Sequence, residues 1–258
     1  MTQLVDDPRR AENVSLDGLP PDERHRAWPL EWRDLGWFVA AYVALTGVLA
    51  AVGKLIVGPL DGSVGDRDRE LARWFVDHRT PRLDGWSHWG SMLSETAVKI
   101  VVTAIAVTAM VAIWKRWNEA LLVGGALIFE ASVFLTTTLI VGRHRPPVAK
   151  LEDSPVDSSF PSGHVAAAVV YGAFAIIVAR HTVRRWPVVL TVALSAAVAA
   201  AVGWARLYRG MHHLSDVIAG VLLGLVSVAI TWLIVRGAER RHERGARAIE
   251  PLHREVPA

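Results

Sequence analysis

The stretch SSFPSGHVAAAVVYG places Ser162, Gly163 and His164 at the start of an apolar run. Serine is common at the N-terminal cap of a helix, glycine lets backbone approach a ligand closely, and the free N–H groups of a first helical turn attract anions. His164 would then lie in a first turn, able to give a proton to a bound anion. The alternative is an ordinary capped helix whose histidine only faces the membrane interface.

The stretch AVGWARLYRGMHHLSD contains His212 and Asp216, which are four residues apart and share a face if a helix has begun there. A carboxylate in that position accepts a hydrogen bond from one imidazole nitrogen and leaves the other nitrogen free to attack. His164 can then protonate the leaving oxygen. A nucleophile, an orienting acid and a proton donor are the parts of a covalent phosphatase.

Arginines accompany these stretches: Arg145 follows the third apolar run, and Arg206 precedes the histidines. A guanidinium forks onto phosphate oxygens, so two of them together with helix N–H groups form a phosphate cradle. The alternative is a set of interfacial cations that meet lipid phosphates, with Asp216 as an ion-pair partner. Polar residues of this kind occur in three segments: the loop with Arg145, the PSGH segment, and the stretch from Arg206 to Asp216. Their number favours a phosphate-binding site over lipid contacts. Because the histidines and Asp216 have catalytic assignments, we expect no metal and no cofactor.

The elements that must position these residues are apolar helices. The chain has 258 residues, of which 52% are hydrophobic, and a mean hydropathy of +0.30, which is too apolar for an ordinary soluble domain. Six apolar runs are long enough, or nearly so, to span a bilayer. They lie at about 36–58, 94–114, 119–141, 164–180, 187–205 and 214–235. The sequence therefore predicts an all-α integral membrane bundle of six transmembrane helices.

The segment between the first two runs predicts a further helix. Leu71, Trp74 and Phe75 fall on one helical face with Arg and Asp opposite, which is typical of an amphipathic helix lying in the membrane interface. Trp86 and Trp89 would lie at headgroup depth. The segment is either a plain connector or the lipid-side lip of an active site.

Six spans put both termini on one side, and the distribution of Arg and Lys favours the cytoplasm for that side. The active site would then face outside, and the Ala- and Arg-rich composition suggests a bacterial cytoplasmic membrane. We expect residues 1–34 to be a cytoplasmic tail ending in an interfacial Trp28, Trp32 and Trp37 anchor, with no signal peptide. Residues 35–236 would form the membrane domain and 237–258 a basic cytoplasmic tail that meets anionic lipids, not nucleic acid. The chain has no Cys, which excludes thiol chemistry.

Three motifs carry a resemblance to a known family. RP at Arg145–Pro146, PSGH at Pro161–His164, and R-x5-H-x3-D at Arg206, His212 and Asp216 resemble the type 2 phosphatidic acid phosphatase (PAP2) family in order and spacing over about residues 138–216. The six-run layout extends the resemblance to about 35–236.

The resemblance implies a metal-independent phosphatase that passes through a phosphohistidine. His212 would be the nucleophile, Asp216 its partner and His164 the acid. The implied phosphate binders are Arg145, Arg206, Ser162 and Gly163. Membrane members of the family act on lipid phosphates and pyrophosphates, so the candidate substrates are a polyprenyl pyrophosphate, phosphatidylglycerol phosphate and phosphatidic acid.

The sequence departs from the family pattern at two positions. The first motif of the family is K-x6-RP, and Thr138 stands at the lysine position; Ala205 stands where the third motif usually has Ser. The lost lysine removes a cation from the phosphate site. Arg143 is the first candidate to replace it because it lies on the same loop, and Thr138 itself retains one hydroxyl donor. The other candidates are Lys150, Lys99 and Lys54.

Two other functions remain open on the sequence: a phosphotransferase that uses the same histidine, and a lipid-phosphate binder or transporter without catalysis. A phosphatase for a small soluble ester is a further alternative. Gly220 and Gly224, four apart, either pack closely within the bundle or face a second copy in a homodimer. Glu130, in the middle of the third run, is expected to have a packing role.

Overall fold

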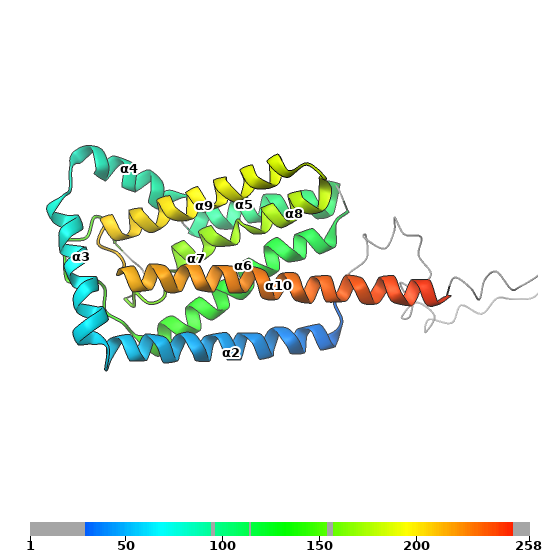
Figure 1. Cartoon of the computed structure of the whole chain (residues 1–258), viewed down its shortest axis with the longest axis horizontal. Helices are drawn as coiled ribbons and strands as arrows, with labels where there is room; N and C mark the ends of the chain where they lie inside the picture. Colours follow the sequence, from blue (N-terminus) through cyan, green and yellow to red (C-terminus); the bar gives the residue numbers. More distant parts are fainter. Residues whose placement is uncertain (1–28, 94–95, 114, 154–156, 250–258) are drawn as a thin grey trace, which may run out of the picture.

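The described part of the chain is helical. The structure is a computed structural model, and it describes residues 29–93, 96–113, 115–153 and 157–249. No strand occurs within these ranges. The long helices α2 (Trp32–Val57), α6 (Trp117–Val141), α9 (Arg185–Tyr208) and α10 (Leu214–Ile249) run along the same long axis of the molecule (Figure 1). The predicted all-α class is confirmed. The expected tail before residue 29, with Trp28, lies outside the described residues.

Within the described ranges, five helices rather than six have the length and composition to cross a membrane: Trp32–Val57, Trp117–Val141, Gly163–His181, Arg185–Tyr208 and Leu214–Arg244. The expected second run is occupied by α5 (Thr96–Thr108) and a π-helical turn, η4 (Ala109–Ile113), with a shorter apolar stretch at Ile100–Ala112. The fourth run forms two helices, α7 (Gly163–Val170) and α8 (Ala173–His181), separated by a turn at Tyr171 and Gly172. Glycine is a weak helix former, which suits this interruption.

A connector joins α2 to α5 across one end of the bundle (Figure 1). It consists of a π-helical turn, η3 (Asp61–Gly65), then α3 (Asp66–Asp77) and α4 (Pro81–Met92). Thr80 caps α4 by accepting the Leu83 N–H at 3.3 Å, and Pro81 occupies its first turn. Trp74 is half exposed, but the inward face of α3 is not purely apolar, because Asp68 is buried there beside Ala72.

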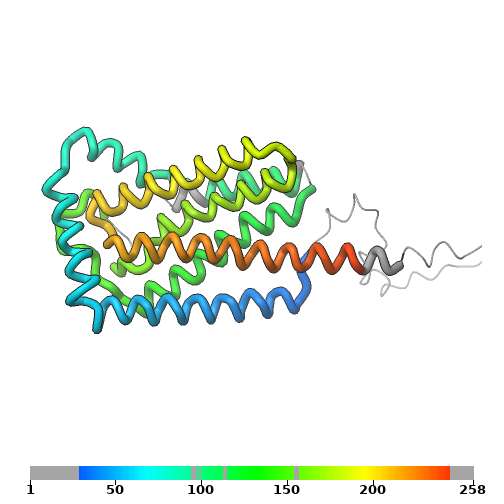
Figure 2. The backbone as a smooth tube through the Cα atoms, viewed as in Figure 1, coloured from blue at the N-terminus to red at the C-terminus, as the bar shows by residue number. Residues whose placement is uncertain are grey.

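The last helix extends past residue 236, where the sequence predicts a tail to begin. Ion pairs hold this extension to other helices: Arg241 Nη2 lies 2.5 Å from an Asp34 carboxylate oxygen on α2, and Arg180 Nη2 lies 2.6 Å from Glu239 Oε1. Figure 2 shows the start of α2 and the end of α10 at the same end of the bundle, opposite the connector. The connector end is therefore remote from both described chain ends.

The core between α2, α6, α7 and α10 is closed by side chains that include Phe129, Val133 and Leu223. Two glycines let α7 and α10 touch. A Cβ atom on Gly220 would lie 2.5 Å from the Ser162 carbonyl oxygen, and one on Gly224 would lie 2.5 Å from that of Ala166. The predicted close packing within the bundle is confirmed for both glycines.

Replacing Gly220 by alanine should therefore separate α7 from α10. We expect a loss of about 1–3 kcal/mol in the free energy of unfolding, because the clashing atom is backbone and has no side-chain freedom to move. Thermal unfolding in detergent measures the change. Gly47→Ala on α2 is the matched control, since its Cβ would meet nothing within 4 Å. That variant should be neutral or more stable, and equal midpoints for the two variants would contradict the close contact.

Candidate active site

His212 lies in the short connection between α9 and α10, and its side chain is only 4% exposed. Gly210, with a φ of +72°, makes the turn after α9 that only glycine adopts readily. His212 Nδ1 lies 2.8 Å from the Ser159 carbonyl oxygen and 3.8 Å from Asp216 Oδ2. Because a carbonyl oxygen only accepts, Nδ1 carries the proton and Nε2 keeps its lone pair. The sequence predicts that Asp216 accepts the hydrogen bond that orients His212. In the structure the Ser159 carbonyl oxygen accepts it at 2.8 Å, and the Asp216 carboxylate lies 3.8 Å from the same nitrogen.

The surroundings of His212 keep its imidazole neutral. Burial lowers the pKa of His212 to about 4, and the positive charges of Arg206 and Arg145 act in the same direction against the opposing effect of Asp216. At neutral pH the ring therefore carries no charge, and Nε2 is available as a nucleophile or base.

Asp216 is fully buried and is held from two sides. His213 donates its backbone N–H to Asp216 Oδ2 at 2.8 Å, and the His213 ring nitrogen Nδ1 lies 3.2 Å from the same oxygen. Arg143 Nη1 lies 2.5 Å from Asp216 Oδ1, while Arg143 Nη2 lies 2.8 Å from Asp68 Oδ2. Arg143, the sequence's first candidate to replace the missing lysine, is thus engaged by two carboxylates. His213, which the sequence gives no role, contacts Asp216 directly.

The PSGH segment meets the start of α10. The Ser162 N–H donates to the Asp216 carbonyl oxygen at 3.0 Å, so the first turns of α7 and α10 lie together. Ser162 is the N-cap of α7 as predicted, but its buried hydroxyl makes no capping bond and has no partner among the described residues. Gly163 faces the Phe134 ring, which a Cβ would approach to 2.9 Å. His164, half-buried in the first turn of α7, lies beside this junction.

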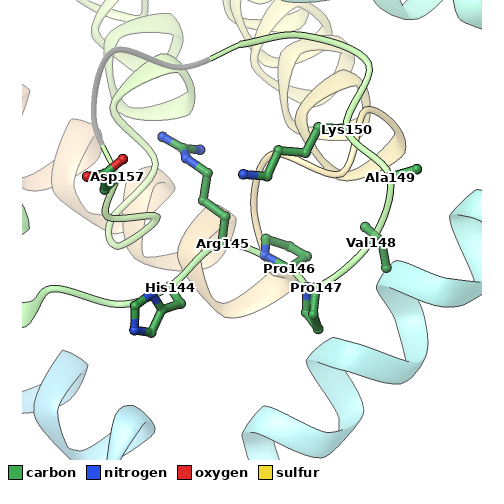
Figure 3. A pocket seen from close by; sticks show the side chains of 8 residues that line it. All are labelled: His144, Arg145, Pro146, Pro147, Val148, Ala149, Lys150 and Asp157. Carbon is green, nitrogen blue, oxygen red and sulfur yellow. The ribbon is translucent and has the colours of Figure 1, made fainter.

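Arg145 lies on the loop that follows α6, and its side chain contacts the backbone of Met211, the residue before His212 in the sequence. Its Nη1 donates to the Met211 carbonyl oxygen at 2.6 Å, and its Nη2 donates to that of Ser158 at 3.4 Å. Burial lowers the pKa of Arg145, against the effect of Asp216 and two other acids. A pocket of about 610 Å³ opens at this arginine (Figure 3). It is lined by His144, Arg145, Pro146, Pro147, Val148, Ala149, Lys150 and Asp157.

Arg206 is buried near the end of α9 and forms an ion pair with Glu152 Oε1. It also donates to Ser91 Oγ at 2.7 Å, and its buried Nε has no partner among the described residues. Glu152 Oε2 lies 2.6 Å from Arg209 Nε. Burial alone would raise the pKa of Glu152, but the neighbouring Arg206 and Arg209 outweigh it and lower that pKa. The ionised carboxylate of Glu152 is therefore paired with Arg206, the arginine to which the sequence analysis assigns phosphate binding.

The hydroxyl of Thr138 and the side chain of Lys54, one of the candidate lysines, are bound to backbone carbonyl oxygens. Thr138 donates to the Phe160 carbonyl oxygen at 3.2 Å, and Lys54 donates to that of Val141 at 3.2 Å. Lys150 lines the pocket beside Arg145. The side chain of Lys99 is outside the described residues. Of the three candidate lysines, Lys150 is the one that lines the same pocket as Arg145 among the described residues.

Sequence reasoning missed Asp68, Glu152 and the Ser159 carbonyl. Asp68 is one of several acids on a polar connector, and Glu152 lies in a loop next to Asp153, so neither has a spacing that marks it. One signal was available for Asp68, because it falls on the same helical face as Ala72 and Phe75 rather than on the charged face.

Comparison with known proteins gives consistent results. A family model described as the PAP2 superfamily matches residues 119–240. The chain is 29% identical over 163 residues to decaprenylphosphoryl-5-phosphoribose phosphatase of Mycobacterium tuberculosis, which covers 62% of this chain and 82% of the relative. It is 33% identical over 129 residues to undecaprenyl-diphosphatase of Sulfolobus acidocaldarius, covering 46% of this chain and 57% of that protein.

The fold has a solved counterpart. The crystal structure of a transmembrane PAP2-type phosphatidylglycerolphosphate phosphatase from Bacillus subtilis superposes with a TM-score of 0.63 at 23% identity, covering 79% of this chain and 96% of the other. This likeness, together with the apolar helices, identifies an integral membrane protein. Residues 119–240, which match the PAP2 superfamily model, include PSGH and the histidine–aspartate pair, and the relatives are named as phosphatases; the chain is thus a hydrolase of phosphoric esters that is similar to PAP2-type phosphatases.

Proposed function

We propose that this protein hydrolyses a lipid phosphate or pyrophosphate without a metal, through a phosphohistidine, at the outer membrane–water interface. The observation that carries the proposal is the buried, neutral His212, whose Nδ1 proton is held by a backbone carbonyl and whose surroundings include two arginines. The relatives named above act on decaprenyl- and undecaprenyl-linked phosphates, which supports a lipid substrate.

In the first step, His212 Nε2 attacks phosphorus and the bond from phosphorus to the leaving oxygen breaks. His164, protonated beforehand, gives its proton to that oxygen. Arg145 and Arg206 bind the other phosphate oxygens, with the N–H groups at Gly163 and the start of α7. The imidazole becomes cationic as it is phosphorylated, and the buried charge of Asp216 stabilises it.

In the second step, His164, now neutral, takes a proton from water as the water oxygen attacks phosphorus. The N–P bond breaks, inorganic phosphate leaves, and His212 returns to its neutral form with Nδ1 still protonated. His164 ends protonated, so both histidines are restored. A phosphotransferase would differ only in replacing water by another acceptor, and a non-catalytic binder would have no use for a neutral buried nucleophile.

The pocket beside Arg145 bears on the substrate. It has room for a polar group next to the phosphate cradle, and Arg145 and Lys150 give it two cations. A second phosphate, as in a polyprenyl pyrophosphate, suits these charges, and the head of phosphatidylglycerol phosphate or phosphatidic acid fits the same rim. We propose that this end faces outside and that both termini lie in the cytoplasm of a bacterial cell: the distribution of Arg and Lys supports the sidedness, and the described chain ends lie at the opposite end of the bundle from this pocket.

A panel of purified lipid phosphates and pyrophosphates tests the proposal directly. In detergent with EDTA, the wild-type protein should release inorganic phosphate from at least one lipid, and His212→Ala should release none because the nucleophile is gone. His144→Ala, on the pocket wall, is the matched histidine control and should retain turnover. Phosphate transfer to an acceptor without free phosphate would indicate the phosphotransferase, and abolition by EDTA would contradict the metal-independent route.

The pH dependence of kcat/KM follows from the state of His212. Because its pKa lies at about 4, the nucleophile stays neutral as the pH falls from 7 to about 5, and activity should be lost only below that range. The rate profile should be corrected for ionisation of the substrate phosphate. An acid limb centred near the ordinary histidine value of about 6.5 would show that His212 is not desolvated.

Glu152→Gln should strengthen the binding of phosphate. Substrate has to compete with the Glu152 carboxylate for Arg206, so neutralising it should lower the inhibition constant of inorganic phosphate by about tenfold, equivalent to about 1.4 kcal/mol. Asp153→Asn, an exposed neighbouring acid, is the control for the general loss of one negative charge. Weaker phosphate inhibition in Glu152→Gln alone would mean that Glu152 holds Arg206 in place instead of competing.

A further inference from the structure

Asp68 is a buried acid on a helix that otherwise points its charges outward. It lies on α3, in the connector between the first two helices, and its side chain is 5% exposed, whereas the Asp66 side chain on the same helix is 64% exposed. A buried carboxylate is costly unless it is paired. Its partners come from two distant segments: Arg143 Nη2 at 2.8 Å, the Ser215 N–H at 3.1 Å, and the Ser215 hydroxyl.

Arg143 joins Asp68 to the active site. One terminal nitrogen of its guanidinium contacts Asp68 and the other contacts Asp216, at 2.8 and 2.5 Å. The Arg143 side chain is 7% exposed, so both ion pairs are shielded from water. Because the guanidinium is planar and rigid, fixing one nitrogen on Asp68 fixes the direction from which the other reaches Asp216.

The charge balance of the group also matters. Two carboxylates share one guanidinium, so the trio of Asp68, Arg143 and Asp216 carries a net charge of about −1 when all are ionised. Asp216 is therefore not neutralised by Arg143 alone, and its Oδ2 atom faces the His213 N–H and lies 3.8 Å from His212 Nδ1. A negative charge at that place favours the cationic form of His212 that develops as the ring attacks.

We propose that Asp68 is a positioning residue of the hydrolysis, acting through Arg143 on Asp216. The inference rests on the proposed function of His212. It gives Arg143 a different role from the phosphate binding that the sequence suggests, and it makes the connector helix α3 part of the catalytic apparatus. Without the Asp68 charge, Asp216 is the one carboxylate among the described residues that still contacts Arg143, and it then offers less negative charge to the nucleophile.

The competing explanation is that Asp68 only fastens α3 to the start of α10. A fastener would change stability and would leave the ionisation of His212 unaltered. The charged groups that act on His212 include Asp216, Arg206 and Arg145, and if Asp68 were only a fastener its replacement would leave the charge that each of them presents to His212 unchanged. The ionisation of His212 therefore separates the two roles.

The experiment compares Asp68→Asn with wild type, using Asp66→Asn as the matched control on the same helix. We expect kcat for the best lipid phosphate to fall by about 10- to 100-fold in Asp68→Asn. KM should stay within about twofold, because Arg145 and Arg206 are intact, and the acid limb of kcat/KM should move to lower pH. Asp66→Asn should match wild type in all three quantities. Unchanged kcat with a lowered unfolding temperature would overturn the inference in favour of the fastener.

Two further measurements cover other outcomes. If Asp68→Asn does not fold, Arg143→Lys keeps the charge but cannot bridge both carboxylates; a fall in kcat supports the inference, and a rise in KM with kcat unchanged overturns it. Histidine-selective nitrogen NMR follows the titration of His212 without any substrate. A lower pKa of His212 in Asp68→Asn supports the inference and an equal one overturns it. Failure of wild type to cleave any lipid would instead count against the proposed function.

Discussion

The buried carboxylate of Asp216 is the group on which the connector end of the bundle depends. Its side chain binds Arg143 and the His213 N–H, and its backbone carbonyl accepts the Ser162 N–H. One residue therefore joins the loop after α6, the first turn of α7 and the first turn of α10. A charge buried this completely is tolerated only with several partners, and satisfying it brings the functional segments together.

The distribution of arginines follows the same logic. Arg143 is balanced by Asp68 and Asp216, and Arg206 with Arg209 by Glu152. Arg145 donates to the carbonyl oxygens of Met211 and Ser158, and the charges of Asp216, Glu152 and Asp157 act on it from nearby. The three loops thus contain strong cations whose charge is partly compensated before any substrate arrives. Such compensation limits the repulsion between arginines that must lie close together to bind one phosphate.

The sequence predicted the parts of this arrangement that depend on local pattern. Apolar runs marked the helices, and the spacing of His212, Asp216 and the PSGH segment marked residues that do lie together. Partner choice was not predictable, because Arg143 pairs with an acid 75 positions earlier and another 73 positions later. Which carboxylate a guanidinium reaches is decided by helix packing, and the glycine contacts between α7 and α10 help to set it. The π-helical turn η4 at Ala109–Ile113, within the second run, is likewise not revealed by composition.

The two chain ends of the described structure lie away from the active site, at the opposite end of the bundle (Figure 2). The long final helix leaves the bundle on that side and is fastened to α2 by Arg241 and Asp34. The end of α10 is therefore a suitable attachment point for experiments. An affinity tag, a fluorescent protein or a surface tether fused there leaves the Arg145 pocket unobstructed. An insertion in the connector would have the reverse effect, since it would disturb the helix that carries Asp68.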